Sequence, residues 1–219
     1  MCSTYISIIC RILEHFKTTI DEFSIIFTSG ATAALKIVAE TFQYGDNGYL
    51  AYLQDNHTSV LGMRAYAENI RAVHHEEILQ ALLDTTDHRT EKSQCENNSL
   101  FVFPAQSNFS GTKYPLSIIN AVYKGAMRKI IGKSSGNWFC MLDAAAFVAT
   151  SELDLSKIKP DFVCISFYKI FGYPSGLGAL LVKNKSAEIL KKKYYGGGTV
   201  QMALSLENIV IQRQELHER

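Results

Sequence analysis

One lysine has the sequence surroundings that an amine nucleophile needs. Lys169 follows the apolar, strand-like run 161–165 and precedes a glycine-rich turn, in the sequence Ser166-Phe167-Tyr168-Lys169-Ile170-Phe171-Gly172. Apolar walls lower the pKa of an amine, so that it can attack an aldehyde and form a Schiff base. A lysine in a turn is more often simply solvated, so this signal needs support from other residues.

A turn between a predicted strand and a predicted helix has the composition of an anion site. The turn Thr28-Ser29-Gly30 leads into a run of good helix formers that starts with Ala31 and Thr32. Free N–H groups and the dipole at a helix start favour a phosphate, and glycine lets the backbone approach it. An ordinary helix cap by Thr28 or Ser29 is the alternative.

An acidic residue stands where another strand is expected to end. Asp143 closes the apolar run 138–142 and lies 26 residues before Lys169 (143 to 169), about one strand-to-strand unit of an α/β fold. Ligands bind at the carboxyl ends of such strands, and a carboxylate there can keep the pyridine nitrogen of pyridoxal phosphate (PLP) protonated. Taken alone, Asp143 could equally cap a helix.

Two further polar residues are expected at the same edge. His57 follows the run 49–53, and its imidazole could stack on a ring. Asn108 follows the run 99–103 and could donate to a phenolic oxygen. The alternatives are a surface histidine and a turn asparagine.

Composition and charge exclude several other functions. The 219 residues are 47% hydrophobic and carry a formal net charge of +1, which predicts a globular chain with no electrostatic footprint for nucleic acid. None of the five cysteines forms a C-x-x-C pair, which is typical of a reducing compartment, and no run is long enough to span a membrane. We therefore expect a cytoplasmic protein.

Strand-like and helix-like patterns alternate along the chain. This alternation predicts an α/β fold with a mostly parallel sheet and helices on both faces. A strand at 177–182 follows its predecessor too closely for a crossover and should run antiparallel, while the polar residues 84–98 predict a flexible surface loop. Helices are expected at about 3–20, 31–43, 58–69, 76–84, 116–131 and 203–217.

Five motifs in order along the chain resemble the class V aminotransferase group of PLP enzymes, which contains the cysteine desulfurases. Within it, the chain is most similar to the N-terminal domain of the eukaryotic molybdenum cofactor sulfurase branch. The motifs are Thr28-Ser29-Gly30-Ala31-Thr32, the stretch from Gln54 to Arg64, the stretch from Phe103 to Gly111, Asp143-Ala144-Ala145, and Ser166 to Gly172. The resemblance implies the large domain of fold type I PLP enzymes over residues 1–219, incomplete at both ends.

The resemblance also implies roles around the cofactor ring. Lys169 would be the Schiff-base lysine, and Asp143 would pair with the pyridinium nitrogen. His57 would stack on the ring, and Asn108 would meet the ring oxygen.

A second set of implied roles concerns the phosphate group. Ala31, Thr32 and Ser166 would contact it within one subunit. Because the family is typically dimeric, Thr199 in the sequence Tyr195-Gly196-Gly197-Gly198-Thr199 would complete the phosphate site of a neighbouring subunit.

Two positions depart from the pattern of bacterial-type desulfurases. Ala146 stands where a glutamine usually follows Asp-Ala-Ala, and Tyr168 replaces the histidine before the lysine. We interpret both as marks of the cofactor-sulfurase branch, and loss of function is the other interpretation.

The implied reaction takes sulfur from L-cysteine, leaves alanine, and forms a persulfide on an enzyme cysteine. In the resembled branch a C-terminal domain absent here holds the molybdenum cofactor, and sulfuration activates xanthine dehydrogenase and aldehyde oxidase. None of the five cysteines looks suited to accept the sulfur, and Cys95 alone has polar surroundings. The alternatives are a stand-alone cysteine desulfurase or lyase, and an inactive truncated isoform that acts through dimerisation.

Overall fold

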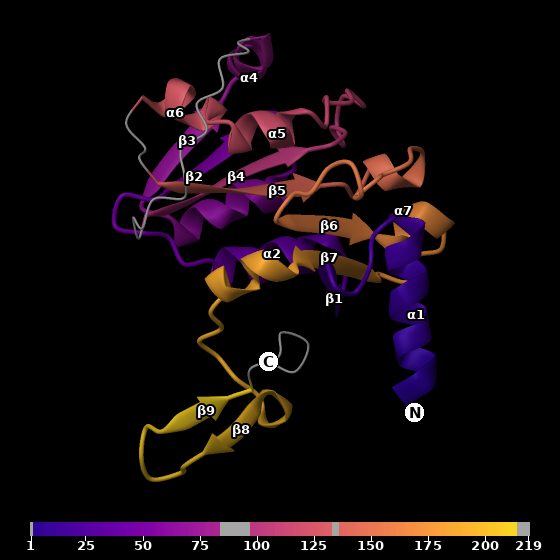
Figure 1. Cartoon of the computed structure of the whole chain (residues 1–219), viewed down its shortest axis with the longest axis vertical. Coiled ribbons are helices and arrows are strands. Elements are labelled where there is room, and N and C mark those ends of the chain that lie inside the picture. Colours follow the sequence, from indigo (N-terminus) through magenta and orange to yellow (C-terminus); the bar gives the residue numbers. More distant parts are fainter. Residues whose placement is uncertain (1, 84–96, 133–135, 214–219) are drawn as a thin grey trace.

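A seven-stranded sheet forms the centre of the molecule (Figure 1). The structure is a computed structural model that describes residues 2–83, 97–132 and 136–213. Across the sheet the strands follow the order β1-β7-β6-β5-β4-β2-β3. Their bounds are β1 (Phe23–Thr28), β2 (Tyr49–Leu53), β3 (Asn69–Val73), β4 (Asn98–Pro104), β5 (Asn137–Asp143), β6 (Phe162–Ser166) and β7 (Gly178–Lys183).

Six of these strands run in one direction, and β7 runs antiparallel to both of its neighbours, β1 and β6. The expectation of a mostly parallel sheet with one antiparallel strand is therefore confirmed. All six parallel strands place their carboxyl ends at the same edge. Residues that follow those strands are brought together although they are distant in the sequence.

Helices cover both faces of the sheet. The first face carries α1 (Cys2–His15), α4 (His75–Leu83), α5 (Ile118–Tyr123), α6 (Ala126–Ile131), α7 (Phe167–Phe171) and the 3-10 turn η2 (Phe147–Ala149). The second carries α2 (Ala31–Thr41), α3 (Thr58–Leu61) and the 3-10 turns η1 (Gly62–Tyr66) and η3 (Asn184–Ile189).

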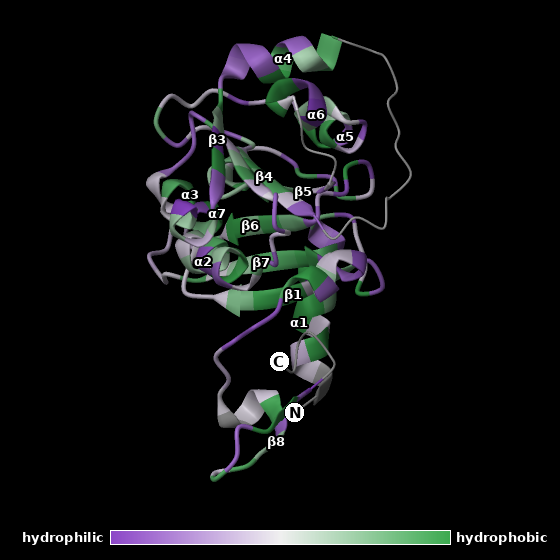
Figure 2. Cartoon of the chain, turned by 90° about the vertical axis from the view of Figure 1, so that its left-hand side faces the viewer, coloured by the Kyte–Doolittle hydropathy of each residue, from purple (hydrophilic) through white to green (hydrophobic). Residues whose placement is uncertain are grey.

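Burial on both faces explains why the central strands are apolar along their whole length. Phe101 and Phe103 of β4 point into one layer of the core, and Leu100 and Val102 point into the other. Strands buried on both faces show no alternation of polar and apolar residues. Most of β6 and β7 is accordingly green, the colour of hydrophobic residues, in Figure 2.

The first helix is shorter than the expected 3–20, since α1 ends at His15. Lys17 has a φ of 55°, in the left-handed region, and the Thr18 N–H donates to the Leu13 carbonyl at 2.9 Å. This is the hydrogen bond of a Schellman-type helix end. The helical spacing of apolar residues continues past His15 in the sequence, which is why a longer helix was predicted. The helix ends because the backbone of Lys17 adopts the left-handed conformation.

Two other helix predictions covered more than one element. The expected helix 58–69 is α3 followed by η1, and its end overlaps the edge strand β3, which we did not predict. The expected helix 116–131 is interrupted at Gly125, whose φ is 96°, so it forms the separate helices α5 and α6. The expected helices 31–43 and 76–84 correspond to α2 and α4, with residue 84 outside the described residues.

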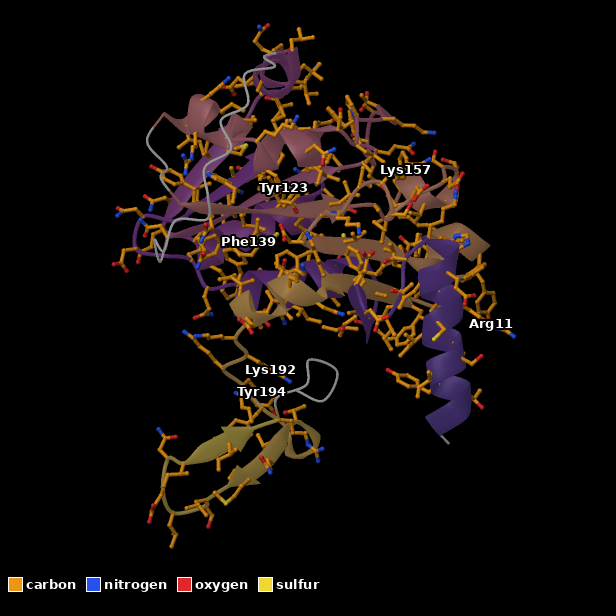
Figure 3. The ribbon with its side chains drawn as sticks, viewed as in Figure 1. Arg11, Tyr123, Phe139, Lys157, Lys192 and Tyr194 are labelled. Carbon is orange, nitrogen blue, oxygen red and sulfur yellow. The ribbon has the colours of Figure 1, made fainter. Side chains whose placement is uncertain are left out.

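The prediction of a helix at 203–217 was wrong for residues 203–213, and the rest of that range lies outside the described residues. The strands β8 (Val200–Ala203) and β9 (Val210–Gln212) pair antiparallel here, after the 3-10 turn η4 (Gly197–Thr199). Met202, Leu204 and Leu206 recur every second residue and are exposed, so no helix face is buried against a core. An extended segment that contains Lys192 and Tyr194 connects this hairpin to the sheet (Figure 3).

The flexible loop predicted at 84–98 falls almost entirely outside the described residues, and Asn98 is already the first residue of β4. Within the described ranges, none of the helices has both the length and the apolar character needed to cross a membrane.

Candidate active site

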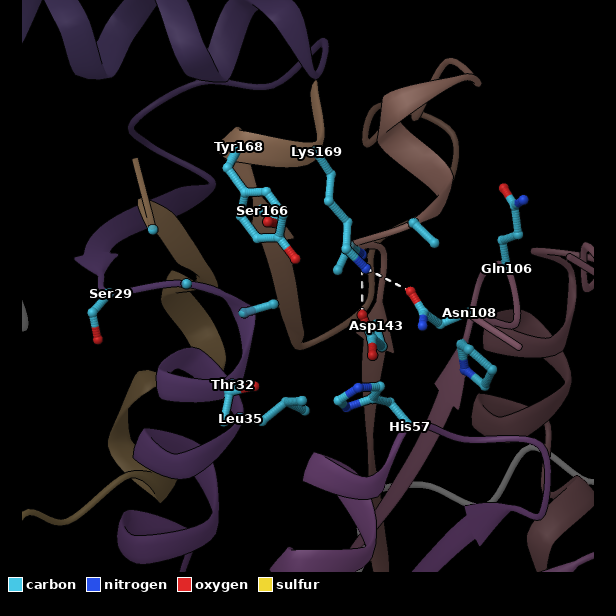
Figure 4. Close-up of a pocket in the computed structure, with 16 residues that line it drawn as sticks. Ser29, Thr32, Leu35, His57, Gln106, Asn108, Asp143, Ser166, Tyr168 and Lys169 are labelled. Carbon is cyan, nitrogen blue, oxygen red and sulfur yellow. Dashed lines mark hydrogen bonds between the residues drawn. The ribbon is translucent and has the colours of Figure 1, made fainter. Parts of the chain in front are cut away.

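A pocket of about 170 Å³ lies at the carboxyl edge of the parallel strands. Figure 4 shows the side chains that line it, which come from segments between Ser29 and Gly176. Seven of the eight residues that the sequence singled out line this pocket. They are Ala31, Thr32, His57, Asn108, Asp143, Ser166 and Lys169.

Lys169 reaches the pocket from α7, a short helix that begins directly after β6. Its Nζ donates a hydrogen bond to Oδ1 of Asn108 at 2.7 Å (Figure 4). The lysine is half-buried and lines the pocket. Gly172 ends α7 in the left-handed conformation, with a φ of 68°, which glycine adopts without strain.

Asp143 ends β5 and is buried, with 8% of its surface exposed. Its Oδ1 accepts hydrogen bonds from the Ala145 N–H at 3.0 Å and from Sγ of Cys164 at 3.3 Å. Burial, together with the neighbouring Asp143 carboxylate, raises the pKa of the Cys164 thiol well above its ordinary value. Cys164 therefore remains protonated and acts as the donor in this pair.

The opposite end of the pocket has the features of an anion site. Gly30 has a φ of 110° and precedes α2, and no side chain caps this helix end. The first N–H groups of a helix lack intrahelical partners and point outward. Beside them lies Oγ of Ser166, which is fully buried and has no hydrogen-bond partner among the described residues.

Close packing of glycines brings these two parts of the anion site together. Gly178 of β7 pairs with Thr28 on one side and with Ser166 on the other. A Cβ at Gly178 would lie 2.6 Å from the carbonyl carbon of Gly30. Only a glycine lets the turn after β1 lie directly against β7, next to the end of β6.

His57 precedes α3 and caps it, since its Nδ1 accepts from the Ser59 N–H at 3.2 Å. Oγ of Ser59 also contacts His57 Nδ1 at 2.9 Å and Oγ1 of Thr32 at 2.8 Å. Ser59 thus links the ring side and the anion side of the pocket, and the sequence analysis gave it no role.

Asn108 lies on a loop that another overlooked residue supports. Oδ2 of Asp55 accepts from the hydroxyls of Tyr114 at 3.0 Å and Ser110 at 3.2 Å. Asp55 follows β2, so it joins the loop that carries Asn108 to the edge of the sheet. The one sequence signal for Asp55 was its position beside His57, directly after a strand.

Thr199 is the predicted residue that does not line the pocket. It lies in η4, where its Oγ1 donates to the Gly196 carbonyl at 2.9 Å. Within one chain it therefore makes no contribution to the anion site.

The buried thiols are poor nucleophiles. Burial raises the pKa of Cys140, and burial with Asp143 raises that of Cys164, well above ordinary values, so both remain protonated. Cys95 lies outside the described residues. In the parts of the chain that the structure covers, no group of acidic, histidine and cysteine side chains could hold a metal ion.

The pocket fits PLP in the chemistry of its donors. The uncapped start of α2 and the partnerless hydroxyl of Ser166 provide donors for a phosphate. The Lys169 amine and the buried Asp143 carboxylate line the same small pocket. PLP requires both groups, because a lysine holds it through its aldehyde and a carboxylate keeps its ring nitrogen protonated. An α/β sheet with these groups at its carboxyl edge is the large domain of a PLP-dependent enzyme of fold type I.

The chain belongs to the aminotransferase class V family, whose model matches residues 12–217. It is 50% identical over 211 residues to "Molybdenum cofactor sulfurase 3" of Aedes aegypti, a match that covers 95% of this chain and 27% of that protein. It is 46% identical over 217 residues to the human molybdenum cofactor sulfurase, covering 95% of this chain and 24% of that protein. The chain therefore spans about a quarter of the length of these relatives.

A solved structure confirms the fold. The complex of the cystine C-S lyase C-DES with its reaction product cysteine persulfide superposes with a TM-score of 0.70 at 16% identity, and it covers 99% of this chain and 55% of that chain.

Proposed function

We propose that this chain is the PLP-dependent, sulfur-abstracting part of a molybdenum cofactor sulfurase. It would take sulfur from L-cysteine and leave alanine, for sulfuration of the molybdenum cofactor of xanthine dehydrogenase and aldehyde oxidase. The observation that carries this proposal is the convergence of Lys169, Asp143 and an uncapped helix start on one pocket. The identity of 50% to a molybdenum cofactor sulfurase over 95% of the chain supports the choice of reaction.

In the proposed mechanism each pocket residue has a separate task. Lys169 would hold the cofactor through Nζ and would take the proton from the α-carbon of the substrate. Bound PLP supplies an electron sink for that step. Asp143 would hold a proton on the ring nitrogen, and the ring of His57 would pack against the cofactor.

Asn108 has two tasks in turn. Its amide group would donate to the ring oxygen of the cofactor, and its Oδ1 accepts from the free Lys169 amine at 2.7 Å. The phosphate is held by Ser166, Thr32 and the N–H of Ala31 at the start of α2.

The sulfur leaves L-cysteine by attack of a thiolate on the substrate sulfur. The thiolate becomes a persulfide and the carbon–sulfur bond breaks. The β-carbon takes up a proton, and the α-carbon regains the proton that Lys169 removed, which gives alanine. Since the pKa values of Cys140 and Cys164 are raised, neither supplies this thiolate. We assign sulfur acceptance to a different cysteine.

The two departures from bacterial-type desulfurases are compatible with activity. Tyr168 directs its ring and hydroxyl toward the pocket (Figure 4), so a polar group still lies beside Lys169. Ala146 also lines the pocket, and its methyl group occupies little space and makes no hydrogen bond there. We therefore interpret both residues as features of the sulfurase branch.

We also propose that the chain is a cytoplasmic homodimer in which Thr199 reaches the phosphate site of the partner subunit. Two observations support the dimer. Thr199 lies on a unit apart from its own pocket, and aromatic side chains near the pocket are strongly exposed, with Phe109 at 98%, Phe171 at 75% and Tyr173 at 73%. Sedimentation of the PLP-loaded chain should give twice the monomer mass, and a monomer would contradict this proposal.

The decisive experiment traps the cofactor on its lysine. The purified chain is incubated with PLP, reduced with borohydride and digested, and the labelled peptide is identified by mass spectrometry. We expect one label, on Lys169, and none there in Lys169→Arg, which keeps the charge. Label spread over surface lysines would show that the pocket does not hold PLP.

The remaining candidates differ in their products. A stand-alone desulfurase would release alanine with a thiol acceptor, whereas a lyase like the one named in the structural comparison would release a cysteine persulfide from cystine. A chain that acts only through dimerisation would give neither product, and it would form a heterodimer with a full-length relative in size-exclusion chromatography.

A further inference from the structure

We infer that Cys164 is a positioning residue for Asp143: its thiol holds Oδ1 of the carboxylate against the sheet, so that Oδ2 is presented to the ring nitrogen of the cofactor. This inference rests on the proposed function for the identity of the ligand. The contact between the two side chains is independent of it.

The contact is fixed by strand pairing. Asp143 of β5 and Cys164 of β6 are directly opposite in the parallel register. The Ala144 N–H donates to the Cys164 carbonyl at 3.0 Å, which ties the two backbones at this position. Opposed residues on adjacent strands project to the same face, so the thiol and the carboxylate meet at 3.3 Å.

The two oxygens of Asp143 have different surroundings. Oδ1 accepts from Sγ of Cys164 and from the Ala145 N–H. Within the described part of the chain, no hydrogen bond to Oδ2 is present. A carboxylate held by two donors on one oxygen cannot rotate freely, and its second oxygen keeps its lone pairs for a ligand in the pocket.

The thiol is suited to this task because it does not ionise. It is completely buried, and its environment disfavours the thiolate. A hydrogen bond from a neutral donor stabilises the charged form of a carboxylate and lowers its pKa. Cys164 therefore remains a hydrogen-bond donor to Oδ1 of Asp143.

The first test measures Asp143 itself, without cofactor. In protein labelled with 13C at the aspartate carboxyl, the Asp143 resonance is assigned by its loss in Asp143→Asn and followed with pH. In Cys164→Ala, we expect the titration midpoint to rise by about 0.5–1 pH unit. Cys164→Ser keeps a donor and should restore the original midpoint.

The other ionisable groups that face Asp143 remain in every variant. Lys169 and Tyr168 from α7 and His57 from the turn after β2 line the same pocket, so their contributions cancel in the comparison. Cys140→Ala is the matched control, because Cys140 is an equally buried thiol on β5 whose side chain lies in the other layer of the core from Cys164. It should create a similar cavity and leave the midpoint unchanged.

The second test measures PLP affinity by equilibrium dialysis. We expect Cys164→Ala to bind PLP about 3–10-fold more weakly, as the loss of one hydrogen bond that orients the carboxylate implies, with Cys164→Ser and Cys140→Ala close to the original protein. An unchanged Asp143 midpoint in Cys164→Ala would overturn the inference. A shifted midpoint in a protein that binds no PLP would support the contact and contradict the proposed function instead.

Discussion

The phenol of Tyr114 shows how a side chain outside the pocket supports it. Tyr114 is nearly buried, with 6% of its surface exposed, and donates to Asp55 at 3.0 Å. Burial, and then the hydrogen bond to the Asp55 carboxylate, raise the pKa of Tyr114 to about 12. The hydroxyl therefore keeps its proton, and the bond that anchors the Asn108 loop persists, well above neutral pH.

We expect Tyr114→Phe to lower the free energy of unfolding by about 1 kcal/mol at pH 7, the usual contribution of such a hydrogen bond. Since the pKa of Tyr114 is higher in the folded state than the ordinary value of about 10, its contribution is complete below pH 10. It is lost as the pH rises toward 12. Urea unfolding at pH 7 and pH 11 should show a smaller gap between wild type and variant at pH 11.

The exposed Tyr173 provides the control for this measurement, because 73% of its surface is exposed. Tyr173→Phe should change neither value. A Tyr114→Phe variant that is as stable as the wild type at pH 7 would show that the bond to Asp55 does not anchor the loop.

A buried carboxylate has a structural role at the amino end of β6, at the edge of the sheet opposite the pocket. Asp161, directly before β6, accepts from the Cys140 N–H at 2.7 Å, from the Tyr123 hydroxyl at 2.7 Å and from Oγ of Ser186 at 2.5 Å. Burial raises its pKa, and these three donors oppose that shift. The side chain thus ties β5, α5 and η3 to the start of β6.

We expect Asp161→Ala to lower the free energy of unfolding by about 3 kcal/mol or more, because three buried donors lose their acceptor. Chemical denaturation measures this loss. The exposed Asp21 is the matched position, and Asp21→Ala should remain within about 0.5 kcal/mol of the wild type. Equal effects of the two substitutions would contradict the structural role of Asp161.

At the scale of elements, the position of the anion site depends on the contact of the β1–α2 turn with β7. A methyl group at Gly178 would lie 2.7 Å from Cα of Gly30 and 2.7 Å from the Ile165 carbonyl oxygen. Both neighbours are backbone atoms of packed segments, so neither can move without shifting a strand end.

We expect Gly178→Ala to destabilise the protein by about 1–3 kcal/mol, the usual cost of overpacking, and to weaken PLP binding by displacing the start of α2. Thermal unfolding and equilibrium dialysis measure the two effects. Gly62 offers a matched control, since it has a helical φ of −63° and no atom within 4 Å of an added Cβ. Gly62→Ala should be neutral or slightly stabilising, and a neutral Gly178→Ala would show that the turn has room to move.

Elements with strong local patterns were predicted well. The strand runs before Asp143, His57 and Lys169 were identified because buried parallel strands are continuously apolar, and this pattern is visible in one dimension. The edge strand β3 was missed because its residues Asn69–Val73 alternate polar and apolar, and the helical pattern before them overlapped its start. Gly125 and Lys17 broke predicted helices through backbone conformations that depend on the packing of the next segment.

At the scale of the whole molecule, the β8–β9 hairpin is a separate unit. It lies apart from the seven-stranded sheet in Figure 1, and its apolar residues Met202, Leu206 and Ile211 are exposed at 42%, 97% and 45%. A side chain that is exposed in the monomer contributes little to monomer stability. In the proposed dimer these residues would be buried against the partner subunit, since Thr199, which directly precedes β8, is proposed to reach the partner's phosphate site.

We expect a chain that ends at Lys193 to have a thermal unfolding midpoint within about 4 °C of that of the full chain, when both are monomeric at high dilution. For a protein of this size, a change of about 1 kcal/mol in the free energy of unfolding shifts the midpoint by 2–4 °C. Differential scanning fluorimetry measures this midpoint. The same truncation should abolish dimerisation. A truncated chain that is unfolded at every concentration would show that the hairpin supports the sheet directly.

The sequence by itself determined the α/β class, the antiparallel β7 and the edge positions of Lys169, Asp143, His57 and Asn108, because strand apolarity and the residues that follow each strand are local properties of the chain. The roles of Ala31, Thr32 and Ser166 at the same pocket were implied by the family resemblance. The roles of Ser59, Asp55 and Cys164 were decided by the tertiary structure alone. Each acts through a partner that is 21 to 59 residues away in the sequence, namely Thr32, Tyr114 and Asp143. Strand order and register create such contacts, since they determine which side chains meet, and these long-range pairings have no pattern in a single sequence.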